Sequence, residues 1–263
     1  MKALGIKYIV FAMAVALSFK GLSQTKLKTD KATQKARQAS GDSIKNKLKI
    51  RKMKVEIWSD VMCPFCYIGK RKFESALAQF ENRDDVEITW KSFQLNPDMK
   101  TDPNKSTLAY LAEVKGWSIE QAQSTTSYVT NMAKEVGLDY NFDKAVVANS
   151  FDAHRLIQLA KTKGKGDAAE ERLFKAYFTE GKNTADHDIL IQLGTEIGLD
   201  AEAMKTMLAG TMYGADVQND IAEGEKLGLT GVPFFVVDRK YGVSGAQQPE
   251  TFLNTLKKAW EDK

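Results

Sequence analysis

The stretch KVEIWSDVMCPFCYIGKRKFESAL, residues 54–77, decides the fold of this chain of 263 residues. Its beginning alternates apolar and polar side chains, which predicts a strand over residues 54–60. From Pro64 to Phe80 the apolar residues recur with a helical period, and VEITWKSFQL, residues 86–95, alternates again. A strand, a helix and a strand of these lengths form a βαβ unit, whose crossover connection makes the two strands parallel.

The middle of the chain has the pattern of successive helices. Ser118 and Gln121 have the spacing of a capping box, in which each side chain bonds the other residue's backbone N–H, and Gly137 is expected to end that helix. Glycines also follow the other predicted helices, which are Ser150–Lys163, Asp167–Glu180, Asp186–Ile197 and Asp200–Leu227.

The last part of the chain returns to strands. PFFVVD, residues 233–238, and YGVSGA, residues 241–246, are short strand patterns joined by a polar turn, and a closing helix is predicted from Pro249 to about Trp260. The order βαβ, helices, ββα predicts an α/β protein with a thioredoxin-like fold and a helical domain inserted in its middle. The thioredoxin-like domain is expected at residues 54–100 and 228–263, and the inserted helical domain at residues 101–227.

The N-terminal residues have the features of an export signal. Lys2 and Lys7 precede an apolar run from Tyr8 to Phe19, so we expect a signal peptide at residues 1–23. The run is shorter than the roughly 20 residues that span a bilayer, which predicts no stable membrane span after cleavage. Export, to the periplasm of a Gram-negative bacterium, is therefore expected; with Met53 as the true start, the protein would be cytoplasmic.

Charge divides the chain into two unequal parts. Residues 25–54 carry 11 Lys and Arg against 2 Asp without a sustained apolar period, so we predict a basic disordered linker over residues 24–53. Residues 55–263 hold 24 basic and 32 acidic side chains, so the folded part is acidic although the whole chain has a formal charge of +4. The overall charge is therefore no evidence for nucleic-acid binding, and no nucleic-acid partner is expected.

Cys63 and Cys66 are the only cysteines of the chain, and they lie at the predicted start of a helix. Pro64 is expected at the first helical position, where a missing N–H does no harm. Backbone N–H groups at a helix N-terminus favour negative charge, which predicts a pKa for Cys63 below the free value of about 8.5. Cys66 lies one turn deeper, where it can attack a mixed disulfide on Cys63 and release the bound partner.

Two other roles for the cysteines fit the sequence less well. A structural zinc site needs four ligands, and the chain adds only His154 and His187, which are not closely paired in sequence. A structural disulfide across so small a loop would remove little entropy from the unfolded chain. We therefore predict a redox-active pair and no metal.

A proline at the start of a buried strand is the second feature of the predicted site. Pro233 opens the strand in GLTGVPFFVVD, residues 228–238, and a proline cannot donate to the sheet ladder, so it must lie at an edge or a strand start. In a thioredoxin-like fold a cis-proline at this position faces the CxxC pair. Val232 would then offer free backbone groups to an extended client peptide. An ordinary trans proline is the alternative.

Three separated stretches carry a resemblance to a known family. They are VEIWSDVMCPFCYIGKRKFESAL at 55–77, NSFDAHRLIQLA at 149–160 and GVPFFVVDRKYGVSGAQQPETF at 231–252. In this order they resemble the FrnE-like branch of the DsbA family of thiol-disulfide oxidoreductases, over essentially all of residues 54–263.

The resemblance implies a redox-active CxxC at Cys63 and Cys66 and a cis-proline at Pro233. The wider superfamily includes 2-hydroxychromene-2-carboxylate isomerases and kappa-class glutathione transferases, which commonly have serine at the position of Cys63.

Other residues in or near these stretches are candidates for supporting roles. The helical domain of the family covers the active site, so the resemblance implies that His154 could stabilise the Cys63 thiolate or contact substrate; a core histidine is the alternative. Phe65, between the cysteines, is expected to contact substrate. A carboxylate at Asp60 could raise a thiol pKa or transfer its proton.

Together these features predict an exported protein disulfide oxidoreductase or isomerase that forms, reduces or reshuffles disulfides in cysteine-containing client proteins. We expect no bound cofactor, with glutathione as a possible redox partner besides an unidentified one. The alternative is a glutathione-dependent isomerase or transferase of small molecules, whose activity would survive loss of Cys66. The residues determine neither the direction of electron flow nor the oligomeric state.

Overall fold

The computed structural model describes residues 52–263, so the predicted signal peptide and nearly all of the predicted linker lie outside the described residues. The linker boundary needs one correction. Met53 is completely buried, begins strand β1 (Met53–Ser59) and pairs with Val86. Its side chain therefore belongs to the folded core, because burying a large apolar side chain stabilises the folded state.

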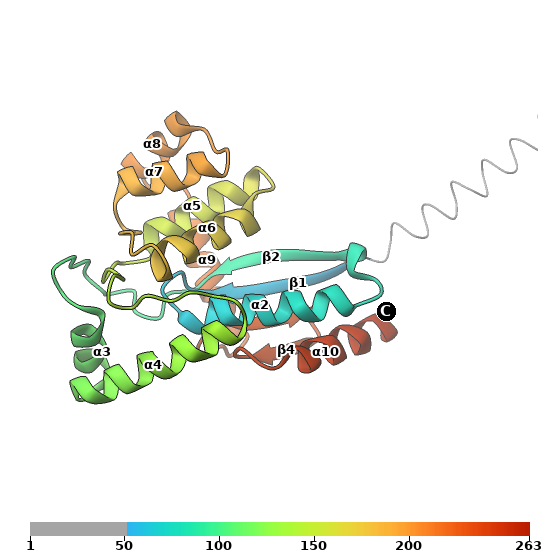
Figure 1. Cartoon of the computed structure of the whole chain (residues 1–263). Coiled ribbons are helices and arrows are strands. Elements are labelled where there is room, and N and C mark those ends of the chain that lie inside the picture. The colour runs from blue at the N-terminus through green and yellow to red at the C-terminus, as the bar shows by residue number, and fades with distance from the viewer. Residues whose placement is uncertain (1–51) are drawn as a thin grey trace, which may run out of the picture. The chain divides into compact units, whose positions relative to one another are not determined.

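A mixed sheet of four strands, in the order β2-β1-β3-β4, forms the centre of the described residues. β1 is parallel to β2 (Val86–Ser92), while β3 (Phe234–Val237) is antiparallel to both β1 and β4 (Tyr241–Ser244). Helix α2 (Pro64–Gln79) connects the parallel pair, which confirms the predicted βαβ unit. Figure 1 shows α2 beside α10 (Pro249–Glu261), the closing helix that the sequence predicted.

Alternation along β1 gives the sheet two different faces. Ile57 pairs with Phe235, and the Phe235 ring packs on Phe73 of α2 with centroids 5.4 Å apart, so this face lies against α2. Trp58 points to the opposite face, where its indole N–H donates to the carbonyl of Asp220 at 2.8 Å. Neighbouring positions of one strand thus lie in different surroundings, as the period of two requires.

Helices between β2 and β3 make up the rest of the fold. Figure 1 shows α7 and α8 furthest from the sheet, with α5 and α6 between, and α3 and α4 apart from them. The Ser118–Gln121 capping box is present at the start of α4, which confirms that prediction. In chain order the elements are η1 (Arg83–Asp85), α3 (Thr107–Lys115), α4 (Ile119–Glu135), α5 (Phe151–Thr162), α6 (Gly166–Phe178), α7 (His187–Glu196), α8 (Ala201–Ala209) and α9 (Gly214–Lys226).

The single helix predicted over Asp200–Leu227 is wrong, because the chain breaks between α8 and α9. The buried guanidinium of Arg155 on α5 donates to the carbonyls of Gly210 at 2.6 Å and Met212 at 2.8 Å. These carbonyls would otherwise need partners within a continuous helix. Gly210 is the C-cap of α8, and a side chain from a different helix satisfies the carbonyls of the break.

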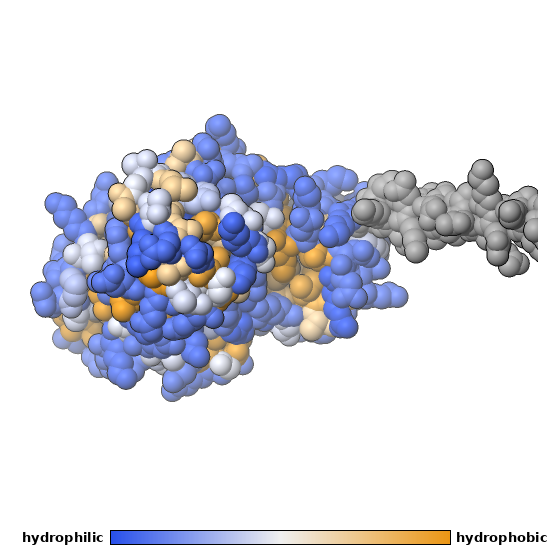
Figure 2. All heavy atoms as spheres, turned by 90° about the horizontal axis from the view of Figure 1, so that it is seen from above, coloured by the Kyte–Doolittle hydropathy of each residue, from blue (hydrophilic) through white to orange (hydrophobic). Residues whose placement is uncertain are grey.

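The surface over α7 and α8 is mainly hydrophilic, with small apolar patches between the polar side chains (Figure 2). Within residues 52–263, no helix combines the length and the apolar character needed to cross a membrane.

Candidate active site

The CxxC pair lies between the end of β1 and the first turn of α2. Cys63 is the N-cap residue of α2, with extended backbone angles of φ −87° and ψ 112°. Its N–H donates to the Asp60 carbonyl at 2.9 Å, and its carbonyl accepts from the Cys66 N–H at 3.0 Å. Pro64 follows in the first turn, which contains no acidic residue. The first turn therefore places no carboxylate near Cys63.

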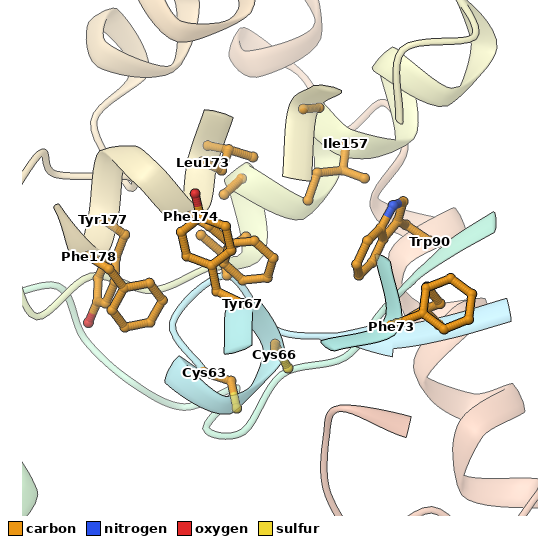
Figure 3. Close-up of a cluster of buried hydrophobic side chains, with 14 of the residues drawn as sticks. Cys63, Cys66, Tyr67, Phe73, Trp90, Ile157, Leu173, Phe174, Tyr177 and Phe178 are labelled. Carbon is orange, nitrogen blue, oxygen red and sulfur yellow. The ribbon is translucent and has the colours of Figure 1, made fainter. Parts of the chain in front are cut away.

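Both cysteines are buried free thiols, with exposed fractions of 3% for Cys63 and 1% for Cys66. Burial raises the pKa of the Cys66 thiol well above its ordinary value, and the neighbouring Cys63 sulfur raises it further. The backbone N–H of Asp60 and the hydroxyl of Ser59 act in the opposite direction on this pKa. Figure 3 shows both sulfur atoms on the side of the turn away from Tyr67.

Pro233 lies across from the pair, and the Val232–Pro233 peptide bond is cis, as the resemblance implied. The Cys63 thiol donates to the Val232 carbonyl at 3.5 Å, which places the start of β3 against the N-cap of α2. Gly69 of α2 packs against the proline. A Cβ at this position would lie 3.0 Å from Cγ of Pro233. The close approach of helix and proline therefore depends on the missing side chain of Gly69.

Apolar side chains surround the thiols at the surface. Phe65 is 37% exposed and Leu95, on the loop after β2, is 49% exposed. Met62 and Val232 are half-buried beside Cys63. Exposed and half-buried apolar side chains therefore lie next to the cysteines in sequence or in contact with them, which suits contact with a polypeptide that has lost its own apolar packing.

Two tyrosines connect the CxxC turn to the helices of the insertion, and sequence reasoning missed both. The hydroxyl of Tyr140 donates to the Pro64 carbonyl at 2.7 Å. The ring of Tyr67 stacks on Phe174 of α6 with centroids 4.9 Å apart, as Figure 3 shows. Tyr67 had a signal in the sequence, because it directly follows Cys66. Tyr140 had none, because it is 76 residues from its partner.

His154 lies behind the CxxC turn, completely buried, and its Nε2 is 3.5 Å from Oδ1 of Asp60. With no exposed surface, its ring cannot contact a client in this conformation. The Asp60 carboxylate also accepts the N–H of Met62 at 3.3 Å and of Leu95 at 2.7 Å. β2 ends at Ser92, three residues before the predicted end at Leu95, and the Leu95 N–H bonds this carboxylate.

Glu170 of α6 is, like Asp60, a buried acidic side chain. It is 1% exposed, and neither carboxylate oxygen has a hydrogen-bond partner within residues 52–263. Burial raises its pKa to about 8, helped by the charges of Asp167 and Asp60 and opposed by Lys70. At neutral pH this side chain is therefore mainly protonated. In the same residues, no three His, Cys, Asp or Glu side chains converge on a point that could hold a metal ion.

The structure thus brings most of the residues proposed from the sequence together at the CxxC turn. It places one of them, His154, elsewhere. The members at the surface turn are Cys63, Cys66, Pro64, Phe65, Val232 and Pro233. His154 lies in the interior with Asp60 instead. The position of the CxxC turn and the position of His154 both depend on how the helices pack on the sheet.

Comparison with known proteins places this geometry in a family. The family model of the DSBA-like thioredoxin domain matches residues 54–257. The uncharacterized protein YwbO of Bacillus subtilis (strain 168) is 31% identical over 192 residues, covering 70% of this chain and 86% of YwbO.

Two solved structures are also similar. The probable DsbA oxidoreductase SCO1869 from Streptomyces coelicolor has a TM-score of 0.76 and 41% identity, covering 80% of this chain and 91% of that one. The cytosolic disulfide reductase DsbM from Pseudomonas aeruginosa has a TM-score of 0.58 and 17% identity, covering 80% of this chain and all (100%) of that one, a likeness of fold. The thioredoxin-like fold with inserted helices is thereby confirmed, and the chain belongs to the DSBA-like thioredoxin domain family.

Proposed function

We propose that this protein is a thiol-disulfide oxidoreductase that exchanges disulfides with client proteins through Cys63 and Cys66. The observation that carries the proposal is the contact of the Cys63 thiol with the Val232 carbonyl at 3.5 Å, beside Pro233. It brings a thiol at a helix N-terminus against a backbone segment that lies just outside β3. A client held along that segment would present its sulfur to Cys63.

The exchange proceeds through a mixed disulfide. As a thiolate, Cys63 attacks a client disulfide and forms a Cys63–client bond, while the other client sulfur leaves with the electron pair and takes up a proton. Once Cys63 is bonded to the client, its thiol no longer occupies the Val232 carbonyl, which is then free to accept a client N–H. Cys66 attacks the mixed disulfide and releases the reduced client. The same steps in reverse oxidise a client dithiol.

The test uses two matched single substitutions in the full chain. Cys63→Ser should abolish reduction of insulin disulfides and refolding of a reduced, unfolded client, because no sulfur remains to form the mixed disulfide. Cys66→Ser should accumulate covalent client adducts on Cys63 that dithiothreitol releases. Full activity of Cys63→Ser would falsify the proposal. Turnover of a glutathione conjugate by Cys66→Ser at the wild-type rate would favour the isomerase or transferase alternative.

We propose also that the protein works outside the cytoplasm, within the FrnE-like branch of its family, with glutathione or a protein as its redox partner. The export proposal is supported by the apolar run from Tyr8 to Phe19 behind Lys2 and Lys7. The N-terminal residue of the mature protein tests it: a start near residue 24 supports export, and a start at Met53 contradicts it. Equilibration with glutathione redox buffers would measure the reduction potential and decide the preferred direction.

A further inference from the structure

The last residue of β1 carries a buried hydroxyl that has no partner in the dithiol form. Ser59 has an exposed fraction of 0%, and within residues 52–263 its Oγ makes no hydrogen bond. Its backbone carbonyl is used, because it accepts the N–H of Phe93 at 2.9 Å. A buried hydroxyl without a partner destabilises the folded state, so such a group calls for an explanation.

Strand alternation directs this hydroxyl toward the CxxC turn. Ser59 lies on the same face of β1 as Ile57, and that face packs against α2. Cys66 is in the first turn of α2 and is 1% exposed. The Ser59 hydroxyl and the backbone N–H of Asp60 lower the pKa of the Cys66 thiol, although in this conformation the hydroxyl makes no hydrogen bond to the sulfur.

Two other groups of the CxxC turn already have hydrogen-bond partners. The Cys63 thiol donates to the Val232 carbonyl at 3.5 Å. The Asp60 carboxylate accepts the N–H groups of Met62 and Leu95 and faces His154. The Ser59 hydroxyl makes no hydrogen bond within residues 52–263, so it is free to turn toward a negative sulfur.

We propose that the Ser59 hydroxyl and the Asp60 backbone N–H form a two-donor cradle that stabilises the Cys66 sulfur as a thiolate during disulfide exchange. The inference rests on the proposed function of the CxxC pair. Ser59 would then be a catalytic residue, because its hydroxyl would turn to bond a reacting sulfur atom. Burial alone disfavours the charged form of Cys66, and the cradle offsets that effect where the charge appears.

The cradle serves both directions of exchange. When Cys66 resolves a mixed disulfide, it loses its proton, its sulfur bonds to Cys63, and the Cys63–client bond breaks. The client sulfur leaves with the electron pair of that bond and takes up a proton. When a client thiolate instead attacks the oxidised pair at Cys63, Cys66 leaves as the thiolate into the same cradle.

The direct test is the titration of Cys66 by its thiolate absorbance in a Cys63→Ser background, where it is the only thiol. Adding Ser59→Ala should raise the Cys66 pKa by about one to two units, the amount by which a hydrogen bond to a charged group shifts an ionisation. In the protein with both cysteines, Ser59→Ala should slow resolution of a glutathione mixed disulfide about three- to twelvefold. Each unit leaves about tenfold less thiolate, while its nucleophilicity rises about threefold.

Ser92→Ala is the matched control. Ser92 pairs with Ser59 in the register of β1 and β2 and is 2% exposed, but its hydroxyl accepts from Gln158 at 3.0 Å. Ser92→Ala should therefore lower the midpoint of urea unfolding and leave the Cys66 titration unchanged. Ser59→Ala should not lower that midpoint in the dithiol form, because no hydrogen bond is lost there. Ser59→Thr, which keeps a hydroxyl, should restore the wild-type Cys66 pKa.

The outcomes separate this inference from the proposed function. An unchanged Cys66 pKa and resolution rate in Ser59→Ala overturn the cradle and leave the function of the CxxC pair standing. An equal shift in Ser92→Ala overturns it as well, because the effect would then come from packing. Full exchange activity in Cys63→Ser contradicts the proposed function itself.

Discussion

Glu170→Gln should change how the stability of this protein depends on pH. The carboxyl group of Glu170 is 1% exposed and has no hydrogen-bond partner within residues 52–263. Burial, with the nearby charge of Asp167, raises its pKa from the usual 4.5 to about 8. Glutamine has nearly the same shape and carries no charge, so the substitution removes the ionisation and little else.

The sign and size of the effect follow from proton linkage. Between pH of about 4.5 and about 8 the folded protein keeps the Glu170 proton, whereas the unfolded chain has released it, so the contribution of Glu170 to stability falls as pH rises through this window. At about 1.4 kcal/mol per pKa unit, the free energy of unfolding of Glu170→Gln relative to wild type should increase by about 3 kcal/mol between pH of about 5 and about 7.5.

Urea unfolding of the reduced protein at several pH values measures this difference, because every other titrating group is common to both proteins. The neighbouring Glu171→Gln is the matched control of opposite sign. Burial raises the pKa of Glu171, but Arg71, Tyr67 and Lys70 together outweigh it and lower the pKa to about 2. The Glu171 carboxylate therefore stabilises the fold above pH of about 4.5, and Glu171→Gln should lose stability there.

The reasoning about Glu170 is refuted by one result in particular. If the unfolding free energies of wild type and Glu170→Gln differ by the same amount at low and at neutral pH, the Glu170 carboxyl is hydrated or paired in the folded protein. A fall in stability on substitution at neutral pH would contradict it equally, because the charged form would then be the stabilising one.

Three further substitutions test contacts around the site. Gly69→Ala should slow exchange with protein clients more than with a small thiol, because its Cβ would lie 3.0 Å from the active-site proline; equal slowing of both contradicts this. His154→Ala should destabilise the protein by about 3 kcal/mol in urea unfolding, because it leaves the buried Asp60 carboxylate without its facing imidazole. A urea midpoint equal to that of the wild type would show that the two groups do not interact. Tyr140→Phe should cost about 1 kcal/mol by the same assay, since it removes the hydrogen bond of 2.7 Å to the Pro64 carbonyl and keeps the ring; no loss would mean that the bond is replaced by water.

Local pattern alone predicted the features of this protein that depend on neighbouring residues. Within a helix a proline fits only the first turn, so Pro64 at the start of the helical pattern placed Cys63 at an N-cap. The side chains of Ser118 and Gln121 reach each other's backbone within one turn, so the capping box was readable as well. The period of two along β1 and of 3.6 along α2 then gave the βαβ unit, because backbone geometry fixes both periods.

Tertiary structure decided the features that join distant parts of the chain. In the break between α8 and α9, Arg155 binds the carbonyl of Met212, which is 57 residues away, and no pattern within Asp200–Leu227 records that contact. His154 was found by resemblance, but only packing shows that it faces Asp60. The sequence thus determined that a CxxC pair opens a helix beside a strand. The packing of side chains from separate elements decided which buried groups surround the two sulfurs, because burial and close contact act through space and not along the chain.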